Sequence, residues 1–121
     1  ALNFYAQCLG GQIAVLHRYG GSPMEAQLPP EWKHKVMHAT LDAGGQRFMA
    51  SDRMPGQPFG GHAGFSMSVN LPKDPVRGET VFKALATGGM VTMPFALTFW
   101  GAHFGMLVDK FGVGWMVNCE V

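Results

Sequence analysis

The feature that most constrains the fold of this chain is a repeated order of elements, in which a helix ending in Gly-Gly is followed by three strands. In the first copy, apolar residues from Leu2 to Leu9 recur with the spacing of a helix that buries one face, and Gly10-Gly11 supplies its left-handed stop. In the second copy, Asp74 is the expected N-cap of a helix that ends at Gly88-Gly89. Two copies of one supersecondary unit are therefore predicted.

Alternating apolar and polar residues predict the strands. Three strands follow the first helix, and Gly44-Gly45 makes the hairpin between the second and the third. In the second copy, one strand precedes the helix and three follow it. Residues 20–33 are predicted to be a loop. The predicted strands are residues 12–19, 35–42, 47–51, 63–70, 90–94, 103–109 and 113–119.

This order predicts an α+β fold in one domain that covers residues 1–121. A lone βαβββ unit leaves one face of its sheet uncovered, so two units are expected to pair into a curved, cup-shaped mixed sheet with the helices outside and a pocket inside. Module one is placed at residues 1–52, a linker at 53–62 and module two at 63–121. Module one lacks the leading strand that module two has.

Composition restricts the partners that we expect. Nine Lys and Arg stand against eight Asp and Glu, and a net charge of +1 gives no reason to expect nucleic acid or an anionic membrane. No apolar run is long enough to span a membrane and the first residues do not resemble a signal peptide, which predicts a cytoplasmic protein. A charged share of only 14% favours an oligomer. Cys8 and Cys119 are expected to be reduced core residues.

Two stretches, Thr98–Met106 and Val108–Cys119, resemble the C-terminal signature of PhnB-like proteins, which are also classified under a domain named for 3-demethylubiquinone-9 3-methyltransferase. Shorter matches occur within Phe4–Gly11, at Val36–Ala39 and at Met49–Asp52, so the resemblance covers nearly the whole chain. It implies a homodimer with the paired βαβββ modules of the vicinal-oxygen-chelate superfamily. That superfamily includes glyoxalase I, extradiol dioxygenases and bleomycin-resistance proteins.

The resemblance also implies where a metal would be bound. Metal-dependent members of the superfamily place His, Gln or Glu on the first and last strands of each module, and matching those strands puts Met49, Gly64 and Met116 at three of the four positions. The fourth lies in the absent leading strand. Either that strand precedes Ala1, which we favour, or a truncation leaves an open sheet edge. Thioether and glycine cannot replace carboxylate and imidazole, so we predict no standard metal site and no cofactor.

Two histidines are weak candidates for catalysis. His38 lies in an alternating strand and would serve as a general base or ligand, although a structural, hydrogen-bonded histidine is the favoured interpretation. His103 is expected in a loop, either as a ligand contact or as an ordinary surface histidine. No two histidines have metal-ligand spacing within one element, because His34 and His38 would be about 13 Å apart along a strand. A metal site built across strands stays open.

The candidate ligand-binding residues come from strands and from one aromatic pair. In the last strand, Trp115 is expected to pack under a helix, and by the resemblance Met116 on the other face corresponds to the metal-facing side. Asn118 shares that face, as an orienting hydrogen-bond donor or as a side chain tied to backbone. Asp109 is expected to cap the amides of the turn before that strand. The predicted ligand-binding residues are Met49, Phe99, Trp100, Met116 and Asn118.

The leading hypothesis is a homodimeric protein that binds a small, largely apolar or aromatic molecule in a metal-free cup. Nine Met and nine Phe suit either a soft pocket or an adaptable core. No nucleophile elbow, nucleotide fingerprint or glycine-rich turn for S-adenosylmethionine is present. The alternatives are a glyoxalase- or dioxygenase-like metalloenzyme with a relocated metal site, and a purely structural interaction module.

Overall fold

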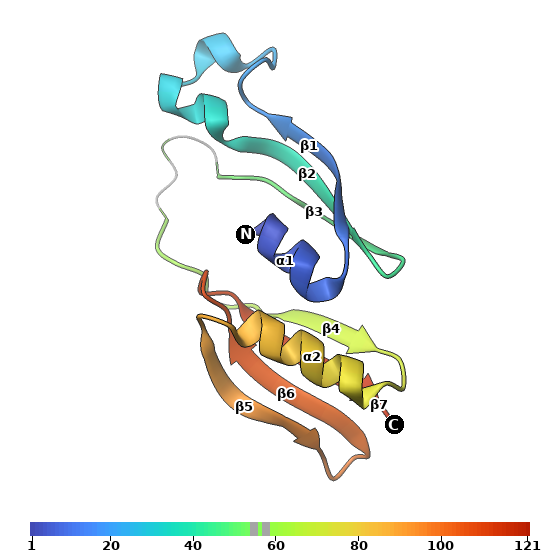
Figure 1. Cartoon of the computed structure of the whole chain (residues 1–121). Helices are drawn as coiled ribbons and strands as arrows, with labels where there is room; N and C mark the ends of the chain where they lie inside the picture. Colours follow the sequence, from blue (N-terminus) through green and yellow to red (C-terminus); the bar gives the residue numbers. More distant parts are fainter. Residues whose placement is uncertain (54–55, 57–58) are drawn as a thin grey trace. The chain divides into compact units, whose positions relative to one another are not determined.

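The computed structural model describes residues 1–53, 56 and 59–121. The chain divides into two compact units, residues 1–59 and residues 60–121, and each has its own sheet and its own helix (Figure 1). The linker predicted at residues 53–62 lies partly outside the described residues, which omit 54, 55, 57 and 58. Among the described residues, no helix has the length and apolar character needed to cross a membrane.

The first unit is a three-stranded antiparallel sheet with one helix. The helix α1 (Leu2–Leu9) contacts β1 and β2, and β2 is the central strand of the order β1-β2-β3. Two short 3-10 helices occupy the segment that was predicted to be a loop, and Pro30 opens the second of them. The remaining elements are β1 (Gln12–Arg18), η1 (Glu25–Gln27), η2 (Pro30–His34), β2 (Val36–Ala43) and β3 (Gln46–Ala50).

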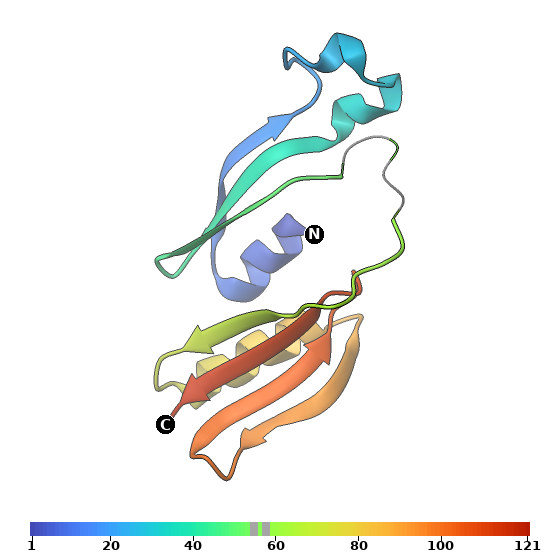
Figure 2. The same cartoon turned by 180° about the vertical axis from the view of Figure 1, so that it is seen from behind.

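The second unit is a four-stranded mixed sheet with one helix, in the order β4-β7-β6-β5. The leading strand β4 pairs in parallel with β7, whereas β6 pairs antiparallel with both β5 and β7. Figures 1 and 2 show α2 on one side of this sheet and no helix of the same unit on the other. The elements are β4 (Met67–Leu71), α2 (Pro75–Ala86), β5 (Met90–Leu97), β6 (Ala102–Val108) and β7 (Gly114–Glu120).

The predicted α+β class and the predicted element order are confirmed, with two corrections to strand bounds. The strand β4 begins at Met67 rather than at residue 63, and Gly64, with a φ of 79°, interrupts the extended backbone before it. The strand β5 runs past Pro94 to Leu97. It tolerates the proline because β5 is an edge strand and its pairing with β6 is irregular between Met93 and Ala96.

The Gly-Gly pairs follow both helices, and the second glycine of each pair has the same role in both units. Gly10, with a φ of 68°, caps α1 in the left-handed conformation, whereas α2 has an extended cap at Thr87 and Gly88, with a φ of 76°, lies in the turn that follows. The second glycine passes close to a strand of its own unit. A side chain at Gly11 would collide with the carbonyl of Asp42 on β2, and one at Gly89 would collide with the carbonyl of Val108 on β6. This shared construction supports the predicted internal repeat.

Each helix covers one face of its sheet, and the core of each unit lies between them. In the first unit, Ala39 and Leu41 of β2 are fully buried. In the second unit, Asp74 caps α2 as predicted, with its carboxylate accepting from the backbone N–H of Arg77 at 3.0 Å. Cys8 and Cys119 are both free and buried, as predicted. The other main core residues are Tyr5, Leu9, Val81, Phe82, Leu85, Leu107, Trp115 and Val117.

Candidate functional site

The sheet face of the second unit that α2 does not cover, here the helix-free face of the second sheet, carries aromatic, thioether and amide groups. Phe104 lies opposite Asn118, and Met106 lies opposite Met116, in the pairing of β6 with β7. Asn70 of β4 lies beside Asn118 in the parallel pairing. Because paired residues project from the same side of a sheet, these five residues define one continuous surface.

The two asparagines of this face bond to each other. Asn118 donates from Nδ2 to the side-chain oxygen Oδ1 of Asn70 at 2.6 Å. The expectation that Asn118 is tied to backbone is therefore wrong, since its partner is a side chain 48 residues away on a neighbouring strand. The bond leaves the Asn70 amide N–H groups and the Asn118 carbonyl oxygen without a further partner among the described residues, so the pair can offer one donor group and one acceptor.

The turn between β5 and β6 carries the predicted aromatic pair. The N–H of Gly101 donates to the carbonyl of Thr98 at 3.1 Å, which puts Phe99 and Trp100 at the two central positions of a β-turn. The Trp100 ring meets Phe104 edge-on, with ring centroids 5.6 Å apart, and thereby extends the helix-free face. Phe99 is 97% exposed, and its ring contacts Trp100 edge-on, at 4.9 Å between centroids.

Directly after β6, a buried carboxylate holds the turn that leads into β7. Asp109 is 3% exposed. Its Oδ1 accepts from the backbone N–H groups of Phe111 at 2.8 Å and Val113 at 3.0 Å, and its Oδ2 accepts from the indole N–H of Trp115 at 2.8 Å. The predicted capping role of Asp109 is confirmed. Trp115 is buried on the helix-covered face, as predicted, which turns Met116 to the opposite side.

The helix-free face of the first sheet has a different chemistry. The pairings place His17 opposite His38, Thr40 opposite Met49, and Asp42 opposite Arg47. His38, Thr40 and Asp42 alternate with Ala39 and Leu41, so all six paired residues lie on the side away from that buried pair. Met49 is 71% exposed there, and its predicted part in ligand binding stays a prediction. This face therefore carries imidazole, hydroxyl and charged groups beside the apolar side chains of Val15 and Met49.

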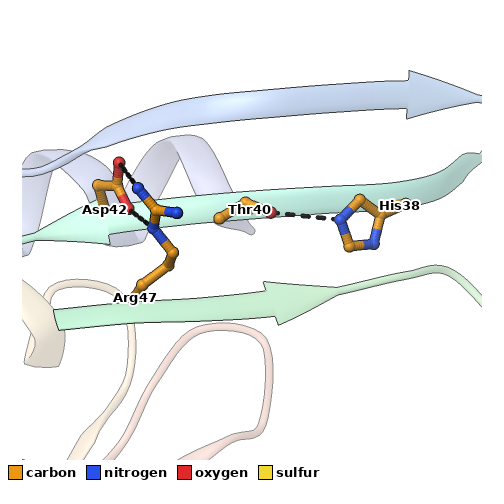
Figure 3. Close-up of polar contacts among 4 residues, drawn as sticks. All are labelled: His38, Thr40, Asp42 and Arg47. Carbon is orange, nitrogen blue, oxygen red and sulfur yellow. Dashed lines mark hydrogen bonds and ion pairs between the residues drawn. The ribbon is translucent and has the colours of Figure 1, made fainter.

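His38 is held by its neighbour on the same strand. Its Nε2 lies 3.2 Å from Oγ1 of Thr40, the arrangement drawn in Figure 3. Thr40 is only 7% exposed, so this hydrogen bond is sheltered from water. The bond agrees with the structural interpretation of His38, and its catalytic role stays a prediction.

The charges on the same face are paired across strands. Arg47 on β3 donates from Nε to Oδ1 of Asp42 on β2 at 2.6 Å and from Nη2 to Oδ2 at 3.3 Å (Figure 3). The hydrogen bond to the Asp42 carboxylate, and then its negative charge, raise the pKa of the Arg47 guanidinium above its ordinary value. The positive charge of Arg47 and the negative charge of Asp42 are therefore paired with each other on this face.

His103 is not in a loop, which corrects the prediction. The turn closes at Ala102, whose carbonyl accepts from the backbone N–H of Thr98 at 2.9 Å, and His103 already pairs with Leu97 and Cys119 inside the sheet. Its ring stacks on Phe95 with centroids 5.9 Å apart, on the side covered by α2. Its Nδ1 is buried and has no hydrogen-bond partner among the residues that the structure describes. His103 therefore lies on the face opposite Phe104.

The positions matched to metal ligands need one further correction. Gly64 precedes β4 and is not part of that strand, so it does not mark the ligand position that was assigned to it. Met116 is on β7 as expected. Within residues 1–53, 56 and 59–121, no three or more His, Cys, Asp or Glu side chains gather in a way that could hold a metal ion.

Comparison with known proteins identifies the family. A family model described as 3-demethylubiquinone-9 3-methyltransferase matches residues 1–118. The chain belongs to this family. It is 30% identical to Protein YjdN of Escherichia coli (strain K12), over 98% of this chain and 84% of that protein. The resemblance to PhnB-like proteins is thereby confirmed.

Solved structures agree with that assignment. Protein PA1353 from Pseudomonas aeruginosa is 47% identical, with a TM-score of 0.84 over 98% of this chain and 85% of that one. A Bacillus cereus protein described as a putative 3-demethylubiquinone-9 3-methyltransferase, PhnB protein, is 28% identical, with a TM-score of 0.75 over 98% and 88%. A glyoxalase/bleomycin resistance protein/dioxygenase family enzyme from Burkholderia phytofirmans PsJN, 15% identical over 98% and 87% with a TM-score of 0.59, shares the fold alone.

Proposed function

We propose that this PhnB-like protein binds a small, largely apolar or aromatic molecule on the helix-free face of the second sheet, without a metal ion. The observation that supports this is the row of Phe104, Met106 and Met116, three half-buried side chains side by side on β6 and β7. Thioethers and an aromatic ring make a soft, polarisable surface that adapts to flat apolar molecules. Trp100 extends it by another ring.

The polar groups around this row suit a neutral ligand. No Lys, Arg, Asp or Glu occurs in residues 84–108, which contain β5, β6 and the turn between them. A charged ligand would therefore lose hydration without gaining a counter-charge from these strands. The Asn70–Asn118 pair supplies one amide donor and one carbonyl acceptor, which can orient a carbonyl or hydroxyl of the ligand. A quinone-like molecule has this combination of a flat apolar ring and neutral oxygen groups.

The methyltransferase in the family's description is not sufficient reason to propose that this protein transfers methyl groups. S-adenosylmethionine sites are commonly built at a glycine-rich turn between a strand and a helix. In the second unit, β4 connects to α2 through Pro72, Lys73 and Asp74, without a glycine. This turn does not fit that cofactor, and we propose binding rather than methyl transfer.

We further propose that the protein is a cytoplasmic homodimer. The support is the low charged share together with an exposed apolar edge strand, β5, whose Met90 and Leu97 are each 62% exposed. Sedimentation equilibrium at micromolar concentration is expected to give twice the monomer mass. A monomer mass at that concentration would contradict the proposed homodimer, and it would leave the ligand-binding proposal unaffected.

The binding proposal is tested by titrating the protein with 2,3-dimethyl-1,4-naphthoquinone in a buffer with EDTA, following tryptophan fluorescence. Both reactive ring positions of this probe carry methyl groups, so it does not alkylate cysteine. Saturable quenching is expected. Met116→Ala should weaken binding about fivefold, since about 1 kcal/mol of apolar contact is lost. Met24→Ala, in the first unit, is the matched control and should bind as the wild type does.

Two results would overturn the proposal. One is the absence of saturable binding for this quinone and for a panel of other neutral bicyclic aromatics. The other is binding that Met116→Ala leaves unchanged. Elemental analysis of native protein tests the metalloenzyme alternative separately. That alternative would be favoured by about one metal ion per chain together with quinone binding that EDTA abolishes.

A further inference from the structure

We infer that His17 and His38 form a two-histidine site for a borderline divalent cation, such as Zn²⁺ or Ni²⁺, on the helix-free face of the first sheet. This inference is independent of the proposed ligand site, which uses residues of the second unit alone. It concerns side chains that sit 21 positions apart in the sequence and that only strand pairing brings together.

The register of β1 against β2 carries the argument. His17 and His38 are direct partners, and the pairing is regular over Val15, Leu16 and His17. Directly opposite residues of an antiparallel pair have Cβ atoms roughly 4.5–5.5 Å apart and project from the same side. Zinc binds imidazole nitrogen at about 2.0–2.1 Å, so two rings that start from such a separation can reach one ion. No pair of histidines within one element offers this.

Both imidazoles have a nitrogen to offer. His17 is exposed, and its ring has no hydrogen bond or ion pair with any described residue. His38 uses Nε2 toward Thr40, and Figure 3 shows its other ring nitrogen turned away from that contact. When Nε2–H donates to Oγ1 of Thr40, the lone pair of His38 lies on Nδ1. Thr40 then fixes the tautomer and the ring orientation, as an outer partner of a metal-binding histidine does.

Two arginines lie on this face, and both are held by hydrogen bonds. Arg47 is bound to Asp42 through two hydrogen bonds. Arg18 follows His17 across an irregularity in the strand pairing and lies opposite Val36, so it projects from the same side as the two histidines, and its guanidinium donates to the backbone carbonyl of His34 at 2.6 Å. Two neutral imidazoles on a strand pair favour Zn²⁺, Ni²⁺ or Cu²⁺ over Mg²⁺ or Ca²⁺, which prefer oxygen. Water completes the coordination, so weaker binding than at a four-ligand structural site is expected.

The test is calorimetric titration of the full chain with ZnCl₂, after dialysis against EDTA and then against metal-free buffer. One Zn²⁺ per chain is expected, and no heat is expected with MgCl₂. His17→Gln and His38→Gln should each lower Zn²⁺ affinity at least about tenfold, since each removes one of two protein ligands. His34→Gln, on η2, is the matched control and should bind Zn²⁺ as the wild type does.

Histidine ring signals in a proton–nitrogen NMR spectrum give a second readout that does not depend on heat. Zn²⁺ should shift the ring signals of His17 and His38 and leave those of His34 in place. Thr40→Val, which keeps the shape and removes the hydroxyl, should lower affinity about tenfold and change the tautomer signature of His38. A merely structural role of Thr40 would leave that signature unchanged.

The inference fails if the wild type binds no Zn²⁺ below millimolar concentration, or if His17→Gln and His38→Gln bind it as tightly as the wild type. Equal thermal midpoints of all variants in EDTA exclude misfolding as the cause of lost binding. Quinone titration in EDTA reports on the second sheet separately, so His17→Gln should not change it. The two proposals can therefore fail independently.

Discussion

The helix-free faces of the two sheets share one architecture and differ in chemistry. In the first unit the face presents imidazole, hydroxyl and a paired charge, with Arg47 bound to Asp42. In the second unit the corresponding face presents Phe104, Met106 and Met116 with one amide pair. A face that the helix of its own unit does not cover is less constrained by packing within that unit, so its residues can differ between the two sheets, and we propose that the binding function depends on this difference.

The helix-covered faces of the two sheets resemble each other in chemistry, unlike the helix-free faces. Both are largely apolar, and in both units a glycine after the helix passes close to a strand carbonyl, where a side chain would collide. These positions are fixed by packing density and backbone clearance, which leave little choice of residue. The comparison predicts that substitutions on the two sides of one strand have different consequences: stability on one side, binding on the other.

The largest expected effect comes from Trp115→Ala. Trp115 is 2% exposed and its indole donates to Asp109, so its removal should lower the free energy of unfolding by about 3–5 kcal/mol. Met116→Ala, one residue further on and half-buried on the other face, should cost roughly 1 kcal/mol. Urea denaturation of both variants gives the comparison. Equal losses would contradict the division of β7 into a packing side and a binding side.

The next largest loss of stability is expected for Asp109→Ala. This carboxylate accepts three hydrogen bonds inside a buried turn, and a buried donor left without a partner costs about 1–3 kcal/mol. A loss of about 3 kcal/mol in urea denaturation is expected, because the three bonds are not additive. Asp42→Ala is the control, since that side chain is on a helix-free face. A loss for Asp42→Ala as large as that for Asp109→Ala would contradict this account.

Phe104→Ala separates binding from stability on the second face. Removing the ring should weaken binding of the dimethylnaphthoquinone about tenfold, equivalent to ~1.4 kcal/mol. Arg47→Gln alters the helix-free face of the first sheet and should leave the quinone affinity unchanged. Fluorescence titration measures both. A weaker affinity in Arg47→Gln with an unchanged affinity in Phe104→Ala would reverse the assignment of the two faces.

A smaller effect is expected for the Asn70–Asn118 pair. A double-mutant cycle with Asn70→Ala and Asn118→Ala should give a coupling free energy of roughly 0.5–1 kcal/mol, the usual contribution of one neutral hydrogen bond. Thermal or urea unfolding of the four proteins gives the value. Additive effects of the two substitutions would show that the bond does not connect β4 to β7.

The smallest effect on stability is expected from the Asp42–Arg47 ion pair on the helix-free face of the first sheet. Asp42→Asn should leave the urea midpoint nearly unchanged, and any difference should vanish in high salt. The pKa of Arg47 is raised, so its stabilising contribution is present below its ordinary pKa and is lost only at more alkaline pH. No pH dependence from Arg47 is therefore expected between pH 6 and pH 9. A midpoint difference that changes across that range would contradict the assignment.

Local sequence signals predicted much of this structure. The Gly-Gly pairs, Asp74 and the alternation in the last strand depend on residues near in sequence, and they correctly gave the helix ends, the cap and the side of Trp115. The capping role of Asp109 was found for the same reason, since its partners lie within six residues.

Most of the missed features depend on strand pairing. His103 was placed in a loop because its strand membership depends on how Thr98 and Ala102 close the turn. The Asn70–Asn118 bond and the His17–His38 partnership join residues far apart in sequence, and no local pattern encodes such a register. The start of β4 depended on the left-handed φ of Gly64, which the residue type permits but does not require.

The proposed binding of a flat apolar molecule to the helix-free face of the second sheet is tested most directly by NMR. Protein with ¹³C-labelled methionine methyl groups is titrated with the dimethylnaphthoquinone in EDTA. The signals of Met106 and Met116 should shift and saturate together, while Met37, on the helix-covered side of β2, stays in place. Saturable binding that leaves Met106 and Met116 unshifted would contradict the account.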